Sequence, residues 1–288
     1  MRKIKFLMLA LSVALLNGCA TKPSQSTEQQ RIVATSVATL EILDKLNIDA
    51  VVGRPDSDNY EIPEKYKDAK GLGSPMQPNM ETVKSLEPTM VLSPNSLEGE
   101  LKPQYDAIGV DSYFLNLKSV DGMYQSIKDL GKMFDREKEA KALCDEYEQF
   151  KASFKEDTHG KKPPRVLILM GLPGSYVVAT ESSYVGSLVK LAGAVNVYGD
   201  GDGKDFLNIN TEDMLEKAPD MILRTSHAMP DQVMAMFEEE FNENDIWKHF
   251  DAVKKGKVYD LDHEYYGMSA TFRYKEALEA LSPVLYGE

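Results

Sequence analysis

Short apolar runs alternate with amphipathic stretches along the first part of the chain. The runs at residues 32–35, 50–53 and 89–93 predict short buried strands. Leucines at positions 40, 43 and 46 mark one face of a predicted helix after the first run, and residues 80–86 predict another helix. Strands and helices that alternate at this spacing predict parallel β–α units.

A long helical zone follows. Apolar residues recur every three or four positions from 120 to 134, and again from 140 to 154. Asp135 lies in the break between the two stretches and could cap the second helix, which would run for about 22 residues, or ~33 Å at 1.5 Å per residue. The polar residues on that helix suit a half-exposed strut. We therefore expect connecting helices over residues 119–160, including one long helix that joins two lobes.

The strand and helix pattern restarts after Pro164. Residues 165–170 form a buried-strand run, and the last helical pattern covers residues 270–281. The predicted fold class is α/β, with two β–α lobes joined by a single long backbone helix and a ligand cleft between the lobes. The N-terminal lobe would span residues 31–118 and the C-terminal lobe residues 161–288.

The N-terminus has the pattern of a bacterial lipoprotein signal peptide over residues 1–18. Three basic residues precede an apolar run at 6–16, which is too short to cross a bilayer. The run ends in Leu-Asn-Gly-Cys, so Cys19 is the expected lipid attachment site. The alternative is an ordinary signal peptide that happens to end near a cysteine. Residues 19–30 are polar and predict a flexible tether, which would leave the protein at the cell membrane, on its extracytoplasmic face, held only by lipid.

The net charge and the motif content exclude several classes of function. The chain has 288 residues and a net charge of −13, whereas a nucleic-acid binder would carry a basic stripe. Nucleophile-elbow, phosphate-loop and zinc-protease motifs are all missing from the sequence. We therefore expect no enzyme activity and no nucleic-acid partner. A surface lipoprotein hydrolase and a purely structural surface lipoprotein are the alternatives from other classes.

Two residues occupy corresponding places in the two predicted lobes. Met76 lies in a loop stiffened by two prolines, after which Asn79 can cap the next helix. His227 follows a strand and precedes Pro230, which would open a helix. Taken singly, a loop histidine can be a polar surface residue and a loop methionine a filler of gaps. As a facing pair, a thioether and an imidazole match haem iron with two axial ligands.

Four segments of the chain resemble the class III (helical-backbone) substrate-binding proteins of ABC importers, and more narrowly the IsdE-type haem-binding lipoproteins of the iron-regulated surface determinant system. They are GLGSPMQPNMETVKSLEPTMVLS, RVLILMGLPGSYVVAT, APDMILRTSHAMP and NDIWKHFDAVKKGKVYDL. The haem ligands of that family fall on Met76 and His227. The resemblance implies haem b as the cofactor, and a monomer that receives haem from upstream cell-surface carriers and delivers it to an ABC permease.

The resemblance also implies other roles. Pocket walls would fall at Ser36, Val37, Tyr265 and Tyr266. The wider class docks on its permease through one acidic residue on each lobe, and these positions resemble Glu81 and Glu212. Without the resemblance, the two acids could equally be ordinary charges at helix N-termini.

The closest alternative function keeps the fold and changes the cargo to a ferric siderophore or cobalamin. A siderophore pocket would need convergent arginine and aromatic side chains. Arg224 is the candidate that the predicted lobes offer for such a pocket.

Overall fold

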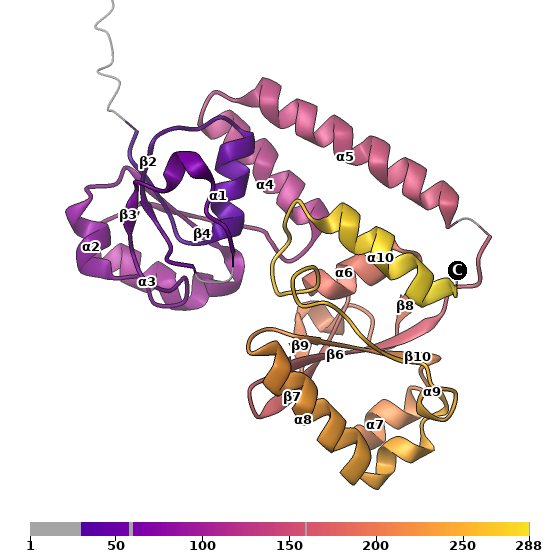
Figure 1. Ribbon diagram of the computed structural model, residues 1–288. Helices are drawn as coiled ribbons and strands as arrows, with labels where there is room; N and C mark the ends of the chain where they lie inside the picture. The colour runs from indigo at the N-terminus through magenta and orange to yellow at the C-terminus, as the bar shows by residue number, and fades with distance from the viewer. Residues whose placement is uncertain (1–29, 58–59, 159, 288) are drawn as a thin grey trace, which may run out of the picture. The chain divides into compact units, whose positions relative to one another are not determined.

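The computed structural model describes residues 30–57, 60–158 and 160–287 (Figure 1). The predicted signal peptide, Cys19 and almost all of the predicted tether lie outside the described residues. From Arg31 onward the chain forms one compact unit that contains two β-sheets. Within the described residues, no helix is both long enough and apolar enough to cross a membrane.

The first sheet is entirely parallel, as the spacing of strands and helices predicts. Its order is β3-β2-β1-β4-β5. The strands are β1 (Ile32–Ala34), β2 (Val51–Arg54), β3 (Lys70–Gly71), β4 (Met90–Pro94) and β5 (Ser112–Leu115). The helices of this lobe are α1 (Val37–Lys45), α2 (Met80–Ser85) and α3 (Glu98–Ile108), with short 3₁₀ turns η1 (Glu64–Tyr66) and η2 (Asn95–Leu97).

Successive side chains of β1 lie in two different hydrophobic cores. Ile32 and Ala34 pack with α1, whereas Val33 packs with α2 and α3 on the opposite face of the sheet. Successive side chains of a strand point to opposite faces, so a strand with helices on both sides is apolar at every position. That is why the run at 32–34 shows no alternation.

The second sheet has the order β11-β10-β6-β7-β9, and β8 pairs with β6. Its strands are β6 (Arg165–Leu172), β7 (Ser175–Ala179), β8 (Val195–Asn196), β9 (Phe206–Leu207), β10 (Met221–Ser226) and β11 (Val258–Asp260). The helical elements are α6 (Tyr184–Leu191), η3 (Gly201–Gly203), α7 (Thr211–Glu216), α8 (Pro230–Glu243), η4 (Asp245–His249), α9 (Asp251–Lys254) and α10 (Tyr274–Tyr286). One face of this sheet packs with α6 and α10, the other with α7, α8 and α9.

One strand of the second lobe breaks the parallel pattern, and one predicted helix begins later than expected. β7 runs antiparallel to both β6 and β9, because only Pro173 and Gly174 separate it from β6 and so short a connection can only make a hairpin. The C-terminal helix begins at Tyr274 rather than at 270. The Ala270 N–H instead donates to the Leu117 carbonyl at 2.7 Å, which ties this segment to the end of the first lobe.

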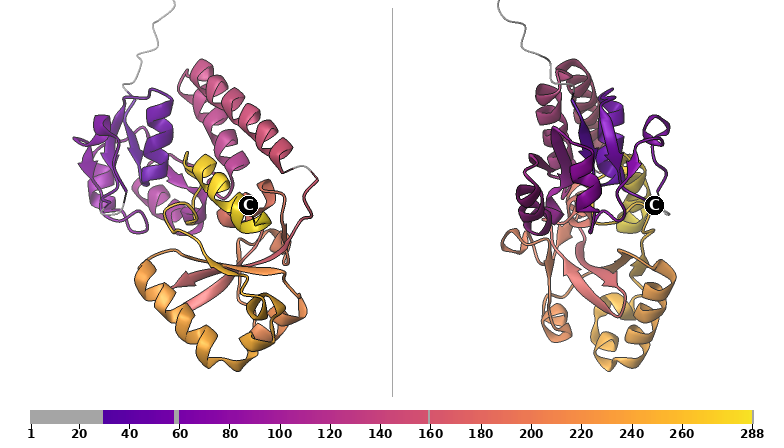
Figure 2. Two further views of the ribbon diagram at one scale, coloured as in Figure 1. Left: turned by 45° about the vertical axis from the view of Figure 1, so that its right-hand side comes forward. Right: turned by 90° about the vertical axis from the view of Figure 1, so that its left-hand side faces the viewer.

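The chain passes from the first sheet to the second through α4 (Val120–Met133) and α5 (Glu137–Asp157). α5 is 21 residues long and is the expected strut. The role expected of Asp135 is wrong: Arg136 holds the cap position, without a side-chain cap bond, and Asp135 has a φ of +55° in the turn after α4. A short polar residue tolerates this left-handed conformation at a helix end. Figure 2 shows α4 and α5 side by side.

Candidate ligand site

A loop closed by its own backbone carries Met76. The Asn79 N–H donates to the Leu72 carbonyl at 2.8 Å, and the Gln77 N–H donates to the Ser74 carbonyl at 3.1 Å. Between these bonds Met76 stands at the tip, with 54% of its surface exposed. The loop follows β3, so Met76 lies beyond the carboxyl end of a parallel strand, where α/β proteins place ligand-binding residues.

Asp56 holds the base of this loop. Its N–H donates to the Gly73 carbonyl at 2.9 Å, and its carboxylate accepts from the Gly73 N–H at 3.1 Å. A Cβ at Gly71 would lie 2.5 Å from the Asp56 carboxylate, so a larger residue there would push the Asp56 side chain away from Gly73. Asn79 caps α2 as predicted, since its side chain accepts from the Thr82 N–H at 2.8 Å. The methionine is therefore presented on a braced loop.

His227 follows β10 directly. Its N–H donates to the Gly171 carbonyl of β6 at 3.1 Å, which extends the ladder by one residue beyond Ser226. The residue keeps access to solvent, yet the atoms packed around the ring remove enough water to lower the pKa of His227. The neutral imidazole is the form that ligates metal. α8 begins at Pro230, as predicted.

The four expected pocket-wall residues differ in how much they can offer a ligand. Ser36 caps α1 by accepting from the Thr39 N–H, and Val37 is 9% exposed. Tyr266 is 2% exposed and its hydroxyl donates to the Ala277 carbonyl at 2.6 Å. The ring of Tyr265 is half-buried. Since the Tyr266 hydroxyl is already engaged, Tyr265 is the more accessible of the two tyrosines.

Glu81 and Glu212 occupy equivalent positions in two equivalent helices. α2 and α7 are each six residues long, each has the acid at its second position, and both acids are exposed. An asparagine caps each helix, since Asn210 accepts from the Asp213 N–H at 2.8 Å just as Asn79 does from Thr82. Both acids therefore lie in a first turn, where the helix dipole favours negative charge.

The same repeat extends to the other end of these helices. Arg31 donates to the Leu86 carbonyl at 2.6 Å, and Arg165 donates to the Lys217 carbonyl at 2.7 Å. Arg31 directly precedes β1, and Arg165 is the first residue of β6. β1 pairs in parallel with β4, which follows α2, and β6 pairs in parallel with β10, which follows α7. Neither arginine was predicted to have this role. The local signal for it is an arginine directly before the run at 32–34 and another at the first position of the run at 165–170.

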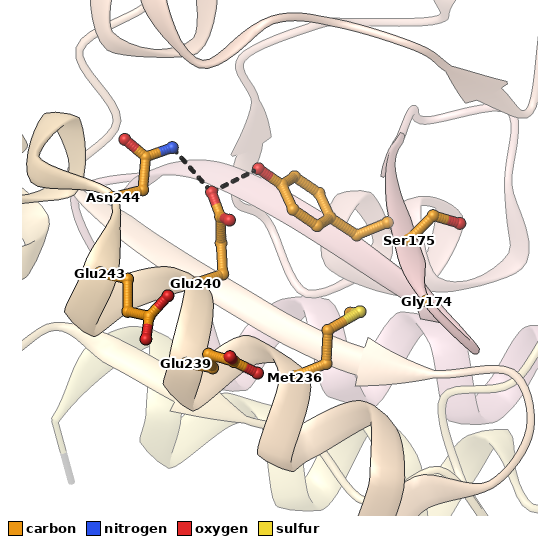
Figure 3. Close-up of a pocket in the computed structure, with 8 residues that line it drawn as sticks. Gly174, Ser175, Met236, Glu239, Glu240, Glu243 and Asn244 are labelled. Atoms are coloured by element: carbon orange, nitrogen blue, oxygen red, sulfur yellow. Dashed lines mark hydrogen bonds between the residues drawn. The ribbon is translucent and has the colours of Figure 1, made fainter.

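A pocket lies near the β6–β7 hairpin (Figure 3). Its central carboxylate is Glu240, which already accepts from the Tyr176 hydroxyl, the Trp247 Nε1–H and the Asn244 amide at 2.9–3.1 Å. None of the expected haem-site residues lines this pocket. In the parts of the chain that the structure describes, no three His, Cys, Asp or Glu side chains form a group that could hold a metal ion.

The model of the periplasmic binding protein family matches residues 32–265. The chain belongs to this family. It is 43% identical to the high-affinity heme uptake system protein IsdE of Staphylococcus aureus, over 99% of each chain. The crystal structure of S. aureus IsdE complexed with heme matches with a TM-score of 0.83 and 44% identity, over 89% of this chain and 99% of that one.

A second solved structure is similar to this chain in both sequence and fold. An ABC transporter substrate-binding protein from Listeria monocytogenes matches with a TM-score of 0.85 and 46% identity, over 91% of this chain and all of that one. Members of this family are binding components of transporters rather than enzymes, so this periplasmic binding protein is not an enzyme. The predicted two-lobed α/β fold is confirmed.

The positive charge of Arg224 in this binding protein is already paired with a carboxylate. Its guanidinium donates two bonds to the Asp260 carboxylate at 2.6 and 2.7 Å, and it lies over the rings of Phe237 and Phe241. The side chain is buried, with the residue 8% exposed. An arginine paired and stacked in this way is a structural element and offers no free charge to an anionic siderophore.

Proposed function

We propose that this protein is the haem receptor of an ABC importer, which binds haem b and hands it to a permease. The supporting observation is identity over the whole length with a protein of high-affinity heme uptake, combined with a closely similar fold in a heme complex. The proposal includes the domain boundaries: signal peptide 1–18, tether 19–30, N-terminal lobe 31–118, connecting helices 119–160 and C-terminal lobe 161–288. It also includes a monomeric protein that receives haem from cell-surface carriers.

Met76 and His227 would be the two residues that hold the haem iron. Both lie beyond the carboxyl ends of parallel strands, one in each lobe, and both are accessible. When bound, haem supplies an iron centre that takes one soft sulfur and one imidazole ligand. The chain itself supplies a braced loop for the sulfur and a neutral imidazole. Ser36, Val37, Tyr265 and Tyr266 would form the pocket walls, with Tyr265 offering most of the tyrosine surface.

An absorption spectrum tests the ligand pair. Protein from Ala20 onward is mixed with haem and compared with Met76→Ala and His227→Ala. We expect a sharp low-spin Soret band in the wild type, shifted or broadened by each substitution. His249→Ala and Met229→Leu are matched controls, because both residues are exposed. If both alanine variants kept the wild-type spectrum, the ligands would lie elsewhere.

Glu81 and Glu212 would dock the receptor on its permease by pairing with arginines there. Two exposed acids at equivalent helix positions support this reading, and charge pairs at a rim act mainly on orientation and association rate. We expect Glu81→Gln with Glu212→Gln to bind haem normally and to slow haem delivery into permease-containing vesicles. Glu98→Gln, also exposed in a first turn, is the control. Normal delivery by the double variant would refute the docking role.

Cys19 would carry the lipid that anchors the receptor outside the membrane. A thiol at this position of a signal sequence is the acceptor, and two lipid chains give stable anchoring where one gives only marginal binding. We expect the wild type to incorporate labelled palmitate in cells and to sediment with membranes. Cys19→Ala should lose the label. Equal labelling of both proteins would place the lipid on another residue.

A further inference from the structure

Two of the methionines that the structure describes are exposed. The sequence holds 14 methionines, of which Met1 and Met8 lie outside the described residues. Met76 and Met229 are 54% and 58% exposed, while the other described methionines are buried or partly buried. An oxidant in solution therefore reaches these two sulfurs ahead of the rest.

Each exposed methionine lies beside a proposed iron ligand or is one. Met76 is the proposed sulfur ligand. Met229 follows His227 by two residues and has a left-handed backbone, with φ of +48° and ψ of +57°. Each of the two residues keeps more than half of its surface open to solvent in the described part of the chain. A thioether placed for a ligand to reach is, in the ligand-free protein, equally open to small oxidants.

The one described cysteine does not compete for oxidant. Cys144 is 8% exposed, and its thiol lies 3.8 Å from the Tyr124 carbonyl. Burial raises the pKa of the Cys144 thiol, which keeps it in the unreactive protonated form. Protein that starts at Ala20 also lacks Cys19, so oxidation of such protein falls on methionine.

We propose that Met76 is an oxidation site that controls haem binding, an inference that rests on the proposed function. A two-electron oxygen donor such as hydrogen peroxide transfers one oxygen to the Met76 sulfur. The O–O bond breaks, an S–O bond forms, the sulfur gives up two electrons, and the peroxide leaves as water. The product, methionine sulfoxide, is polar and no longer a soft thioether.

The modification removes the ligand without disturbing the fold. Met76 stands at a loop tip with no core packing to lose, so oxidation there leaves stability unchanged. The bonds that brace the loop are made by Asp56, Gly73 and Asn79, and none of them uses the Met76 side chain. Sulfoxide reductases restore the thioether, so the loss of haem binding is reversible.

In the experiment, haem-free protein is first oxidised and then tested for haem binding. Protein from Ala20 onward is treated with graded hydrogen peroxide, the peroxide is destroyed with catalase, and haem is added. Peptide mass spectrometry gives the sulfoxide fraction at each methionine. We expect Met76 and Met229 to oxidise several-fold faster than the buried methionines, and the low-spin Soret band to fall in proportion to Met76 sulfoxide. Methionine sulfoxide reductases A and B should restore it.

Two variants separate the possible causes of a lost Soret band. Met229→Leu should lose the Soret band on oxidation as the wild type does, because Met76 remains. Untreated Met76→Leu tests the proposed function itself: a wild-type spectrum there would mean that Met76 is not the ligand. If Met76→Leu alters the spectrum but full Met76 sulfoxide in the wild type does not, the ligand assignment stands and the oxidation proposal is overturned.

Discussion

Burial shifts two ionisable side chains of this protein in opposite directions for one reason. Packing removes water and so disfavours the charged form of any group. For His227 the charged form is the protonated one, so the pKa falls. For Glu41 on α1 the charged form is the deprotonated one, so burial raises the pKa, although Arg273 and Lys45 counter part of the effect. Each shift predicts its own dependence on pH.

We expect haem affinity to change less than twofold as pH is lowered from 8 to the ordinary histidine pKa of 6.5. A lowered pKa means that more than half of the His227 imidazole is still neutral, and able to ligate, at that pH. Affinity should fall only at lower pH, as the ring protonates. Haem titrations at closely spaced pH values measure this. A decline that is already complete by pH 7 would contradict the prediction.

Glu41→Gln should stabilise the protein at pH 7 by about 1 kcal/mol, because the neutral amide avoids the cost of holding a charge where one carboxylate oxygen is buried without a hydrogen-bond partner. The sign follows from the raised pKa. The folded state holds the Glu41 proton more tightly than the unfolded state, so stability is present at low pH and is lost as pH rises through the folded pKa. The gain should therefore shrink toward pH 4.

Urea unfolding of wild type and Glu41→Gln at pH 4 and pH 7 measures this difference. Glu100→Gln, at an exposed position, should change stability little at either pH. A variant less stable than the wild type at pH 7 would mean that the attraction of Glu41 to Arg273 and Lys45 outweighs its burial.

At the scale of single elements, α2 and α7 are built alike and should respond alike to the loss of their caps. Each helix is too short to be stable alone, so its capping asparagine matters. Beyond the cap the two differ in their surroundings. Asn79 closes the Met76 loop, whereas no proposed haem ligand lies beside Asn210.

Asn79→Ala and Asn210→Ala should each lower the free energy of unfolding by about 1 kcal/mol, the usual effect of losing an N-cap. Only Asn79→Ala should also speed haem release, because losing the side-chain cap frees the start of α2, where the loop that carries Met76 ends. Urea unfolding gives the first quantity, and transfer of haem to an excess of apomyoglobin gives the second. Faster release from both variants alike would show that the effect is general and not local to the loop.

At the scale of the whole molecule, an aromatic cluster ties the C-terminal helix to the connecting pair. Tyr124 of α4 and Tyr147 of α5 stack at 4.3 Å between ring centroids. Tyr274 at the start of α10 meets both rings edge-on, at 5.9 and 5.5 Å, and its hydroxyl lies 3.1 Å from that of Tyr124. Elements 150 residues apart therefore share one core.

Tyr274→Ala should destabilise the protein by roughly 3 kcal/mol, the usual scale for deleting a fully buried aromatic ring. Since the ring belongs to a core shared by three helices, we expect one unfolding transition at lower temperature rather than two separate ones. Scanning calorimetry measures both features. Tyr60→Ala, at a position 48% exposed, should barely move the transition. Separate transitions in Tyr274→Ala would mean that the lobes unfold independently once the cluster is broken.

Much of this protein follows from local sequence. The 3.6-residue and continuous apolar patterns predicted α1, α2, β1 and β6 because each depends only on which side chains face a core. Asn79 as a cap and Pro230 as a helix start were predictable because such positions obey rules that span three or four residues. The two-lobed α/β class followed from the order of these elements.

Only the tertiary structure decided the long-range contacts and the exposure of single side chains. The contacts join residues that lie far apart in the chain. Arg31 and Arg165 meet carbonyls more than 50 residues away, and Arg224 meets Asp260 across 36. No local rule fixes such partners. The exposure of Met76 and Met229 was also undecided by sequence, since a methionine packs as readily in a core as it stands in a loop. Which apolar side chains remain open to solvent depends on where the whole chain has placed everything else.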